Sequence, residues 1–364
     1  MNRSKDWPAS LLPDDSALQH EHAPRPLPLF LTLVRVAAEN DPTMGRAALA
    51  GLAAYETAER TAMQRERRAA HGVGGATLRD CGGKGPPAVL IPSLINPPHV
   101  LDLDPAVSLA DAIAQNGRRV LLLDWGPAGQ RAQLSVGQHV SELLVPLLRL
   151  LGQPPALIGY CLGGTMAIAA ANLAPTERLV TLATPWNFSA YPPEGRASLA
   201  QLWTYARPAA EALGALPMEV LQSAFWSLDP QRTVEKFAKF AALEPESPNA
   251  RRFIALEDWA NEGEPLPVPA ARELLDDFFG SNLPGNGRWV VGGKAMTDDL
   301  TLPMLHCTAS GDRITPAPTA PSRAGDVVSL QSGHVGMIVG SARAQLHKVV
   351  RDFLTPLAAD ARHR

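Results

Sequence analysis

The 364-residue sequence is poor in cysteine and in net charge. Its three cysteines, Cys81, Cys161 and Cys307, are odd in number and show no CxxC spacing, so neither a disulfide framework nor a zinc site is expected. The formal charge of -3 leaves no excess of basic residues to offset the phosphates of a nucleic acid, and we expect no nucleic-acid partner. Sparse cysteine favours a reducing, cytoplasmic location.

The sequence shows neither the apolar core that a secretory leader requires near its first residues nor an uninterrupted apolar run of membrane-spanning length. Its first residues are charged and then Pro-rich, without an apolar core. One apolar stretch, residues 156–174, is interrupted by Gly159, Gly163, Gly164 and Asn172, which favours a buried strand, turn and helix over a membrane span. We therefore expect no transmembrane segment.

Hydrophobic residues make up 46% of the chain, enough for the core of one large α/β domain with an insertion. The prolines near the N-terminus predict a mobile tail over residues 1–40, because proline disfavours regular structure. After it, Thr43 is a candidate cap for a helix running from about Met44 to Ala70.

Six short apolar runs, separated by helix-like segments, predict a sheet. Runs without polar alternation are typical of strands buried on both faces, as in a mostly parallel sheet covered by helices on both sides. The runs are 88–91, 120–123, 156–158, 179–183, 304–309 and 327–330. The strand-free, aromatic-rich interval 186–302 predicts a helical cap, or lid, inserted between core segments 41–185 and 303–364.

The strongest chemical signal is Gly159-Tyr160-Cys161-Leu162-Gly163, where a buried run meets an Ala-rich helical segment. The pattern is typical of the nucleophile elbow of the α/β-hydrolase fold, whose sharp turn needs glycines beside the reactive residue. A helix N-terminus favours negative charge and so lowers the cost of a Cys161 thiolate. A cysteine that merely packs in the core is the alternative.

An acid and a histidine follow Cys161 in the order that this fold uses. Asp312 follows the fifth apolar run and His334 follows the sixth, so both are expected at the carboxyl ends of strands. We expect His334 to exchange a proton with Cys161, and Asp312 to hold the imidazole tautomer. Asp124 and Asp326 are alternative carboxylates in a poorer sequence context.

A thioester or ester substrate would also need backbone donors for its developing oxyanion. The Leu162 N–H follows the nucleophile, and the loop Pro92-Ser93-Leu94-Ile95-Asn96 offers a second donor from Leu94 or Ile95. A loop that is simply rigid is the alternative. The apolar setting of His306 predicts a core residue, and His99 and His139 lack a patterned partner. We expect no metal and no cofactor.

These residues resemble the polyhydroxyalkanoate synthases, from about Pro87 to Leu354. The elbow is similar to that family's lipase-like box, with cysteine in place of serine. The short chain is similar to the small synthases that work with a helical accessory subunit. Further similar segments are 92–96, 101–103, Leu123-Asp124-Trp125-Gly126, Ala183-Thr184-Pro185-Trp186-Asn187-Phe188 and Gly333-His334-Val335-Gly336.

The resemblance implies transfer of 3-hydroxyacyl groups from coenzyme A thioesters, through acyl-Cys161, to a growing polyester chain. Coenzyme A is then substrate and product rather than cofactor. The implied partners are an accessory subunit and a second copy in a homodimer, and the implied place is the cytoplasm or the surface of a polyester granule. Arg313 stands where family members usually have histidine. A thioesterase or polyester depolymerase with the same triad, and an inactive granule-associated homologue, are the alternatives.

Overall fold

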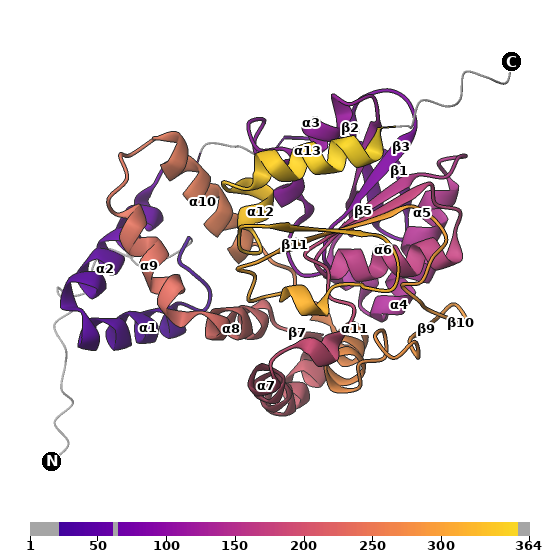
Figure 1. Ribbon diagram of the computed structural model, residues 1–364. Helices are drawn as coiled ribbons and strands as arrows, with labels where there is room; N and C mark the ends of the chain where they lie inside the picture. Colours follow the sequence, from indigo (N-terminus) through magenta and orange to yellow (C-terminus); the bar gives the residue numbers. More distant parts are fainter. Residues whose placement is uncertain (1–21, 61–64, 356–364) are drawn as a thin grey trace, which may run out of the picture. The chain divides into compact units, whose positions relative to one another are not determined.

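The computed structural model describes residues 22–60 and 65–355 (Figure 1). The described chain divides into two compact units. The smaller unit joins the residues up to 60 with residues 230–258, and the larger unit holds the rest. Among the described helices, none combines the length and the apolar character needed to cross a membrane.

An eight-stranded sheet forms the core of the larger unit, counted over the described residues. Its order is β1-β2-β4-β3-β5-β6-β11-β12, and all neighbours from β4 to β12 are parallel. β2 runs antiparallel to β4, and β1 runs antiparallel to β2. The strands are β1 (Arg68–Val73), β2 (Ala76–Gly82), β3 (Pro87–Ile91), β4 (Arg119–Asp124), β5 (Ala156–Tyr160), β6 (Arg178–Leu182), β11 (Met304–Ala309) and β12 (Asp326–Leu330).

Helices cover both faces of this sheet (Figure 1). α3 (Leu109–Ala114) and α13 (Arg343–Leu354) pack against each other on one face. α6 (Leu162–Leu173) packs on β3, β5 and β6 on the other face, beside α5 (Val145–Arg149). The predicted mostly parallel α/β-hydrolase fold is confirmed.

All six predicted runs are strands of the sheet, and β3, β5 and β11 are buried along their whole length. The sequence analysis missed β1 and β2. Both contain charged or polar residues, such as His71 in β1 and Arg79 and Asp80 in β2, so they carry no continuous apolar run. Their antiparallel pairing adds an edge to the parallel sheet.

The N-terminal expectations differ from the structure. Within the expected tail, residues 1–21 lie outside the described residues, but α1 (Leu27–Asn40) is a helix whose proline stands in the first turn, where it costs no hydrogen bond. The expected helix 44–70 is observed as α2 (Pro42–Thr57). It begins earlier, because Asp41 rather than Thr43 is its cap, and it ends earlier, since β1 already begins at Arg68.

The smaller unit packs α1 and α2 with α9 (Pro230–Phe240) and with the part of α10 (Pro248–Asn261) that runs up to Asp258. Its centre is Phe237, which is fully buried. The Phe237 ring lies 4.7 Å from the Phe30 ring, 5.8 Å from the Tyr55 ring and 5.3 Å from the Phe253 ring, measured between centroids. Tyr55 Oη also donates to Asp258 Oδ1 at 2.6 Å. An aromatic cluster therefore holds this unit together.

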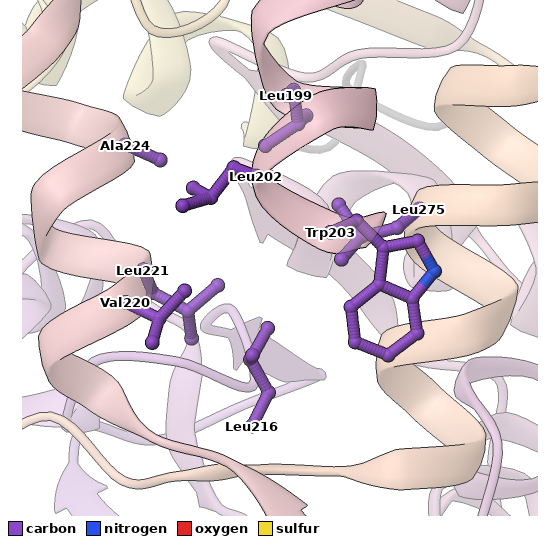
Figure 2. Close-up of a pocket in the computed structure, with 8 residues that line it drawn as sticks. All are labelled: Leu199, Leu202, Trp203, Leu216, Val220, Leu221, Ala224 and Leu275. Atoms are coloured by element: carbon purple, nitrogen blue, oxygen red, sulfur yellow. The ribbon is translucent and has the colours of Figure 1, made fainter. Parts of the chain in front are cut away.

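The interval 186–302 is mostly helical. In the larger unit it forms α7 (Pro193–Leu213), α8 (Met218–Leu228), α11 (Val268–Arg272) and the π-helix η7 (Glu273–Gly280). Its described strands, β7 (Ala215–Leu216), β8 (Leu266–Pro267), β9 (Val290–Val291) and β10 (Lys294–Ala295), have two residues each. A small apolar pocket lies between α7, α8 and η7 (Figure 2). It is lined by Leu199, Leu202, Trp203, Leu216, Val220, Leu221, Ala224 and Leu275.

Candidate active site

Cys161 occupies the turn between β5 and α6 in a strained backbone conformation. Its φ is 56° and its ψ is -131°, in a region that residues with a Cβ rarely adopt. The main chain is tied on both sides, because Cys161 N–H donates to Leu182 O and Cys161 O accepts from Gly164 N–H, each at 2.9 Å. This is the geometry of a nucleophile elbow.

The glycines around Cys161 are required by close backbone contacts. A Cβ on Gly159 would lie 2.4 Å from Gly164 Cα, and a Cβ on Gly163 would lie 2.2 Å from Ile91 O. Both contacts are far below van der Waals distance and involve backbone that cannot rotate away. The elbow therefore packs directly against the end of β3 and the loop that follows it.

His334 and Asp312 form a buried pair at the carboxyl ends of β12 and β11. His334 Nδ1 lies 2.7 Å from Asp312 Oδ2, and Asp312 Oδ1 accepts the N–H groups of Ile314 and Thr315, both at 2.8 Å. The Asp312 side chain is fully buried and that of His334 is 9% exposed. The carboxylate is thus fixed by the backbone and fixes the imidazole in turn.

Electrostatic interactions link His334 to both Asp312 and Cys161. Burial by itself lowers the pKa of His334, because it disfavours the imidazolium. Attraction to the charges of Asp312 and Cys161, together with the hydrogen bond to Asp312, outweighs burial and raises the pKa to about 10. The structure therefore brings the three predicted residues together, in an arrangement that can hold a thiolate beside a protonated imidazole.

Two tyrosines line this cluster and were missed by the sequence analysis. The Tyr160 ring stacks on the His334 ring, with centroids 4.9 Å apart, and Tyr160 Oη donates to His334 O at 3.3 Å. Burial, then the negative charges of Cys161 and Asp312, raise the pKa of Tyr160 well above its usual value, and the same groups raise the pKa of Tyr191. Both phenols remain neutral. The position of Tyr160 directly before Cys161 was a usable signal, whereas Tyr191 gave none.

The oxyanion candidates lie on the two elements that meet at the elbow. Leu162 is the first residue of α6, where backbone N–H groups have no partner within the helix. In the loop after β3, Ile95 N–H donates to Ser93 Oγ at 3.3 Å. Leu94 N–H has no hydrogen-bond partner within residues 22–60 and 65–355. This difference favours Leu94 over Ile95 as the second donor.

The other histidines weighed from the sequence, His306, His139 and His99, interact with residues other than His334, Asp312 and Cys161. His306 is fully buried in β11, bonded to Thr181 Oγ1 at 2.7 Å and to Ala324 O at 2.8 Å, as expected of a core residue. Nδ1 of the fully buried His139 lies 2.7 Å from a backbone oxygen four residues earlier. His99 Nε2 lies 3.9 Å from a carboxylate oxygen of Glu262.

The alternative carboxylates and Arg313 lie elsewhere. Asp124 Oδ2 accepts from Arg79 at 2.8 Å, and Asp326 begins β12 in an exposed position at the far end of that strand from His334. Arg313, which follows Asp312, is 66% exposed and pairs with Asp229 at 3.3 Å. Within the described residues, no cluster of His, Cys, Asp and Glu side chains is arranged to hold a metal ion.

Comparison with known proteins finds relatives of one kind by sequence. The chain is 27% identical over 278 residues to the poly(3-hydroxyalkanoate) polymerase subunit PhaC of Haloferax mediterranei, covering 70% of this chain and 55% of that protein. It is 25% identical over 279 residues to PhaC of Allochromatium vinosum, covering 71% of this chain and 77% of that protein. The chain thus spans only about half the length of the Haloferax protein. No protein-family model matches it.

Among solved structures, the chain is similar to a monoacylglycerol lipase of Paleococcus ferrophilus, with a TM-score of 0.48 and 16% identity over 76% of this chain and 98% of that one. It is also similar to a hydrolase of Pseudomonas aeruginosa, with a TM-score of 0.46 and 17% identity over 77% of this chain and 94% of that one. By sequence, then, this chain of α/β-hydrolase fold resembles the polyhydroxyalkanoate synthases of the PhaC kind over about 70% of its length.

Proposed function

We propose that this chain is a polyhydroxyalkanoate synthase-like acyltransferase. It moves 3-hydroxyacyl groups from coenzyme A thioesters, through an acyl-Cys161 intermediate, to a growing polyester chain. The observation that carries the proposal is the buried pair of His334 and Asp312 interacting with Cys161 at a strained elbow, on a chain whose relatives are named poly(3-hydroxyalkanoate) polymerase subunits.

The proposed chemistry uses only residues of this chain. The Cys161 thiolate attacks the thioester carbonyl, the bond to the coenzyme A sulfur breaks, and the departing thiolate takes the proton of the His334 imidazolium. The acceptor hydroxyl then gives its proton to His334, its oxygen attacks acyl-Cys161, and the thiolate is released. The N–H groups of Leu162 and Leu94 stabilise each oxyanion. Coenzyme A is product and no cofactor takes part.

The other two cysteines are poor nucleophiles by comparison. Burial raises the pKa of the Cys81 thiol to about 12 and that of the Cys307 thiol to about 12. Cys161 is half-buried and sits where a helix N-terminus favours negative charge. Replacing Cys81 is therefore a matched control for replacing Cys161.

The runner-up is a thioesterase or polyester depolymerase, which differs only in letting water reach acyl-Cys161. A synthase must keep water away from acyl-Cys161, and the helical interval 186–302 is the proposed lid. The relatives' name includes the word subunit, which supports a proposed helical accessory subunit. A homodimer, and residence in the cytoplasm or at a granule surface, complete the proposal.

The test is to supply the purified protein with 3-hydroxybutyryl coenzyme A and follow thiol release and the acyl product. Polymer with thiol release supports the synthase, and free acid with thiol release identifies the hydrolase. Cys161→Ala should abolish thiol release while Cys81→Ala keeps it. If the folded wild-type chain releases no thiol, with or without an accessory subunit, the inactive homologue remains as the explanation.

A further inference from the structure

The loop after β3, residues 92–97, is held through its carbonyl oxygens. Trp125 Nε1 donates to Pro92 O at 3.1 Å, and Arg131 Nη2 donates to Leu94 O at 3.4 Å. Both donors come from the segment that follows β4. Hydrogen bonds from a neighbouring element therefore hold the loop that carries the proposed second oxyanion donor.

Two further carbonyls of the same loop are also bonded from outside it. Glu264 N–H donates to Ile95 O at 2.8 Å, and Trp259 Nε1 donates to Pro97 O at 2.8 Å. Because these donors all bond to carbonyls, they leave the Leu94 N–H of the loop available. That is what an oxyanion site requires.

Trp125 and Arg131 bond the carbonyls on either side of the peptide unit that bears the Leu94 N–H. Because each peptide is planar, fixing a carbonyl also fixes the direction of the N–H in the same unit. Anchoring Pro92 O and Leu94 O fixes the peptide units on both sides of the one that bears the Leu94 N–H. The direction of this N–H is thus set largely by Trp125 and Arg131.

Arg131 is 2% exposed, yet its hydrogen bonds go to neutral acceptors. Nε donates to Gly126 O at 3.2 Å, Nη2 to Leu94 O, and Nη1 lies 3.4 Å from His139 Nε2. Arg131 forms no ion pair within 4.0 Å in the described part of the chain. Its hydrogen bonds to backbone carbonyls and longer-range attraction to carboxylates, Glu264 first, offset part of the cost of burying its charge.

The His139 contact is neutral because that imidazole is held without a second proton. Burial lowers the pKa of His139 to about 4, and the positive charge of Arg131 acts in the same direction. Nδ1–H donates to Ser135 O at 2.7 Å, which leaves the Nε2 lone pair facing Arg131. The guanidinium charge is therefore not cancelled by a contacting group.

A second buried arginine shows what a purely structural role looks like in this fold. Arg118 is 1% exposed, but it is paired with both carboxylate oxygens of Glu177 and donates to Leu354 O. Its charge is compensated at contact distance, as stability requires. Arg131 lacks such compensation and lies against the loop beside the elbow.

We propose that Arg131 is a positioning residue for acylation at Cys161. It aims the Leu94 N–H at the developing oxyanion and places an uncancelled positive charge behind the loop. A fixed charge in a buried site favours negative charge that develops nearby, because little solvent is present to screen it. The inference rests on the proposed function, since it assumes that an acyl group is transferred to Cys161.

The test compares two reactions of the same thiolate in the full-length chain. Acylation by 3-hydroxybutyryl coenzyme A or by 4-nitrophenyl butyrate develops an oxyanion, whereas alkylation by iodoacetamide displaces iodide without one. Arg131→Met should slow acylation about 10- to 100-fold, less than the roughly 100- to 1000-fold for losing an oxyanion donor outright because the Leu94 N–H is kept, and leave the alkylation rate unchanged. Arg131→Lys, which keeps the charge but not the fork of donors, should fall between.

The matched control is Arg118→Met, which should lower the melting temperature while sparing both reactions of the folded protein. An equal fall of acylation and alkylation in Arg131→Met, or no fall in either, would overturn the inference. Should Arg131→Met fail to fold, Trp125→Phe removes the bond to Pro92 O and keeps an aromatic ring at that position. It should show the same selective loss at smaller size, and a non-selective loss would overturn the inference.

The proposed function can fail separately. A wild-type chain that is acylated by 4-nitrophenyl butyrate but releases no thiol from the coenzyme A thioester would refute the substrate assignment. The comparison between Arg131→Met and wild type would still be readable with the nitrophenyl ester.

Discussion

Replacing Asp312 by asparagine is expected to uncouple the imidazole from the thiol without displacing it. Asp312 Oδ1 accepts the N–H groups of Ile314 and Thr315, and the amide oxygen of asparagine can keep both bonds. The opposite edge then presents an NH2 group to His334 Nδ1, which can no longer donate to it. The ring is driven to the tautomer with its proton on Nε2, facing Cys161.

The size of the effect follows from the pKa of His334. Its rise from 6.5 to about 10 corresponds to about 5 kcal/mol in favour of the imidazolium, at 1.36 kcal/mol per pKa unit. Asp312 leads the groups that raise it. The fall in kcat/KM for thiol release should therefore exceed about 10-fold, and about 3,000-fold, the equivalent of the whole rise, is its upper bound.

The sign of the pH dependence is fixed by the direction of that shift. A pKa that is raised in the folded state stabilises the fold fully below 6.5 and ceases to do so as pH rises through about 10. In wild type, the imidazolium of His334 therefore persists across neutral pH. In Asp312→Asn it should be lost at lower pH, so the alkaline limb of the rate profile moves toward neutrality.

The assay is the initial rate of thiol release from 3-hydroxybutyryl coenzyme A, measured for both proteins between about pH 6 and pH 10, the span of the His334 shift. Circular dichroism should show the same fold for both. A variant with wild-type rates and an unmoved alkaline limb would refute the assignment of Asp312 as the partner that sustains His334.

Two further predictions concern the scaffold, and both are measured by urea denaturation. Gly163→Ala should destabilise the fold by about 3 kcal/mol or more, because its Cβ would lie 2.2 Å from Ile91 O. The control Gly195→Ala, which has open space at its Cβ in α7, should not destabilise the fold. Equal stabilities of the two variants would contradict the elbow packing. Arg118→Met should cost about 1 to 2 kcal/mol, because it removes the buried bonds to Glu177 and Leu354 O while Glu177, 30% exposed, keeps Arg178 at 3.3 Å; a loss below about 0.5 kcal/mol would show that the pair behaves as a surface ion pair.

Local sequence patterns were enough for the parallel core. A strand buried on both faces is mostly apolar, and β3, β5 and β11 are buried at every position. Strands β1 and β2 were missed because charged and polar residues interrupt their apolar positions. α1 was missed because prolines suggested an unstructured tail, although a proline in the first turn is compatible with a helix.

The elbow could be read from the sequence because steric limits on a sharp turn act on adjacent residues. Gly159 and Gly163 stand on either side of Cys161 since any side chain there would strike backbone. Sequence context could only rank the candidate carboxylates, with Asp312 ahead of Asp124 and Asp326. Folding decided which one contacts the imidazole, since Asp312 lies 2.7 Å from His334 while Asp124 is taken by Arg79.

The sequence by itself thus determined the sheet, the turn that carries Cys161 and the chain order of the acid and the histidine, because each depends on neighbours along the chain. Only the tertiary structure decided that Tyr160 stacks on His334 and that Arg131 holds the loop of Leu94. Those contacts join segments that packing alone brings together. No periodicity or spacing encodes them, since hydrogen bonds and ring contacts depend on distance in space rather than on separation in sequence.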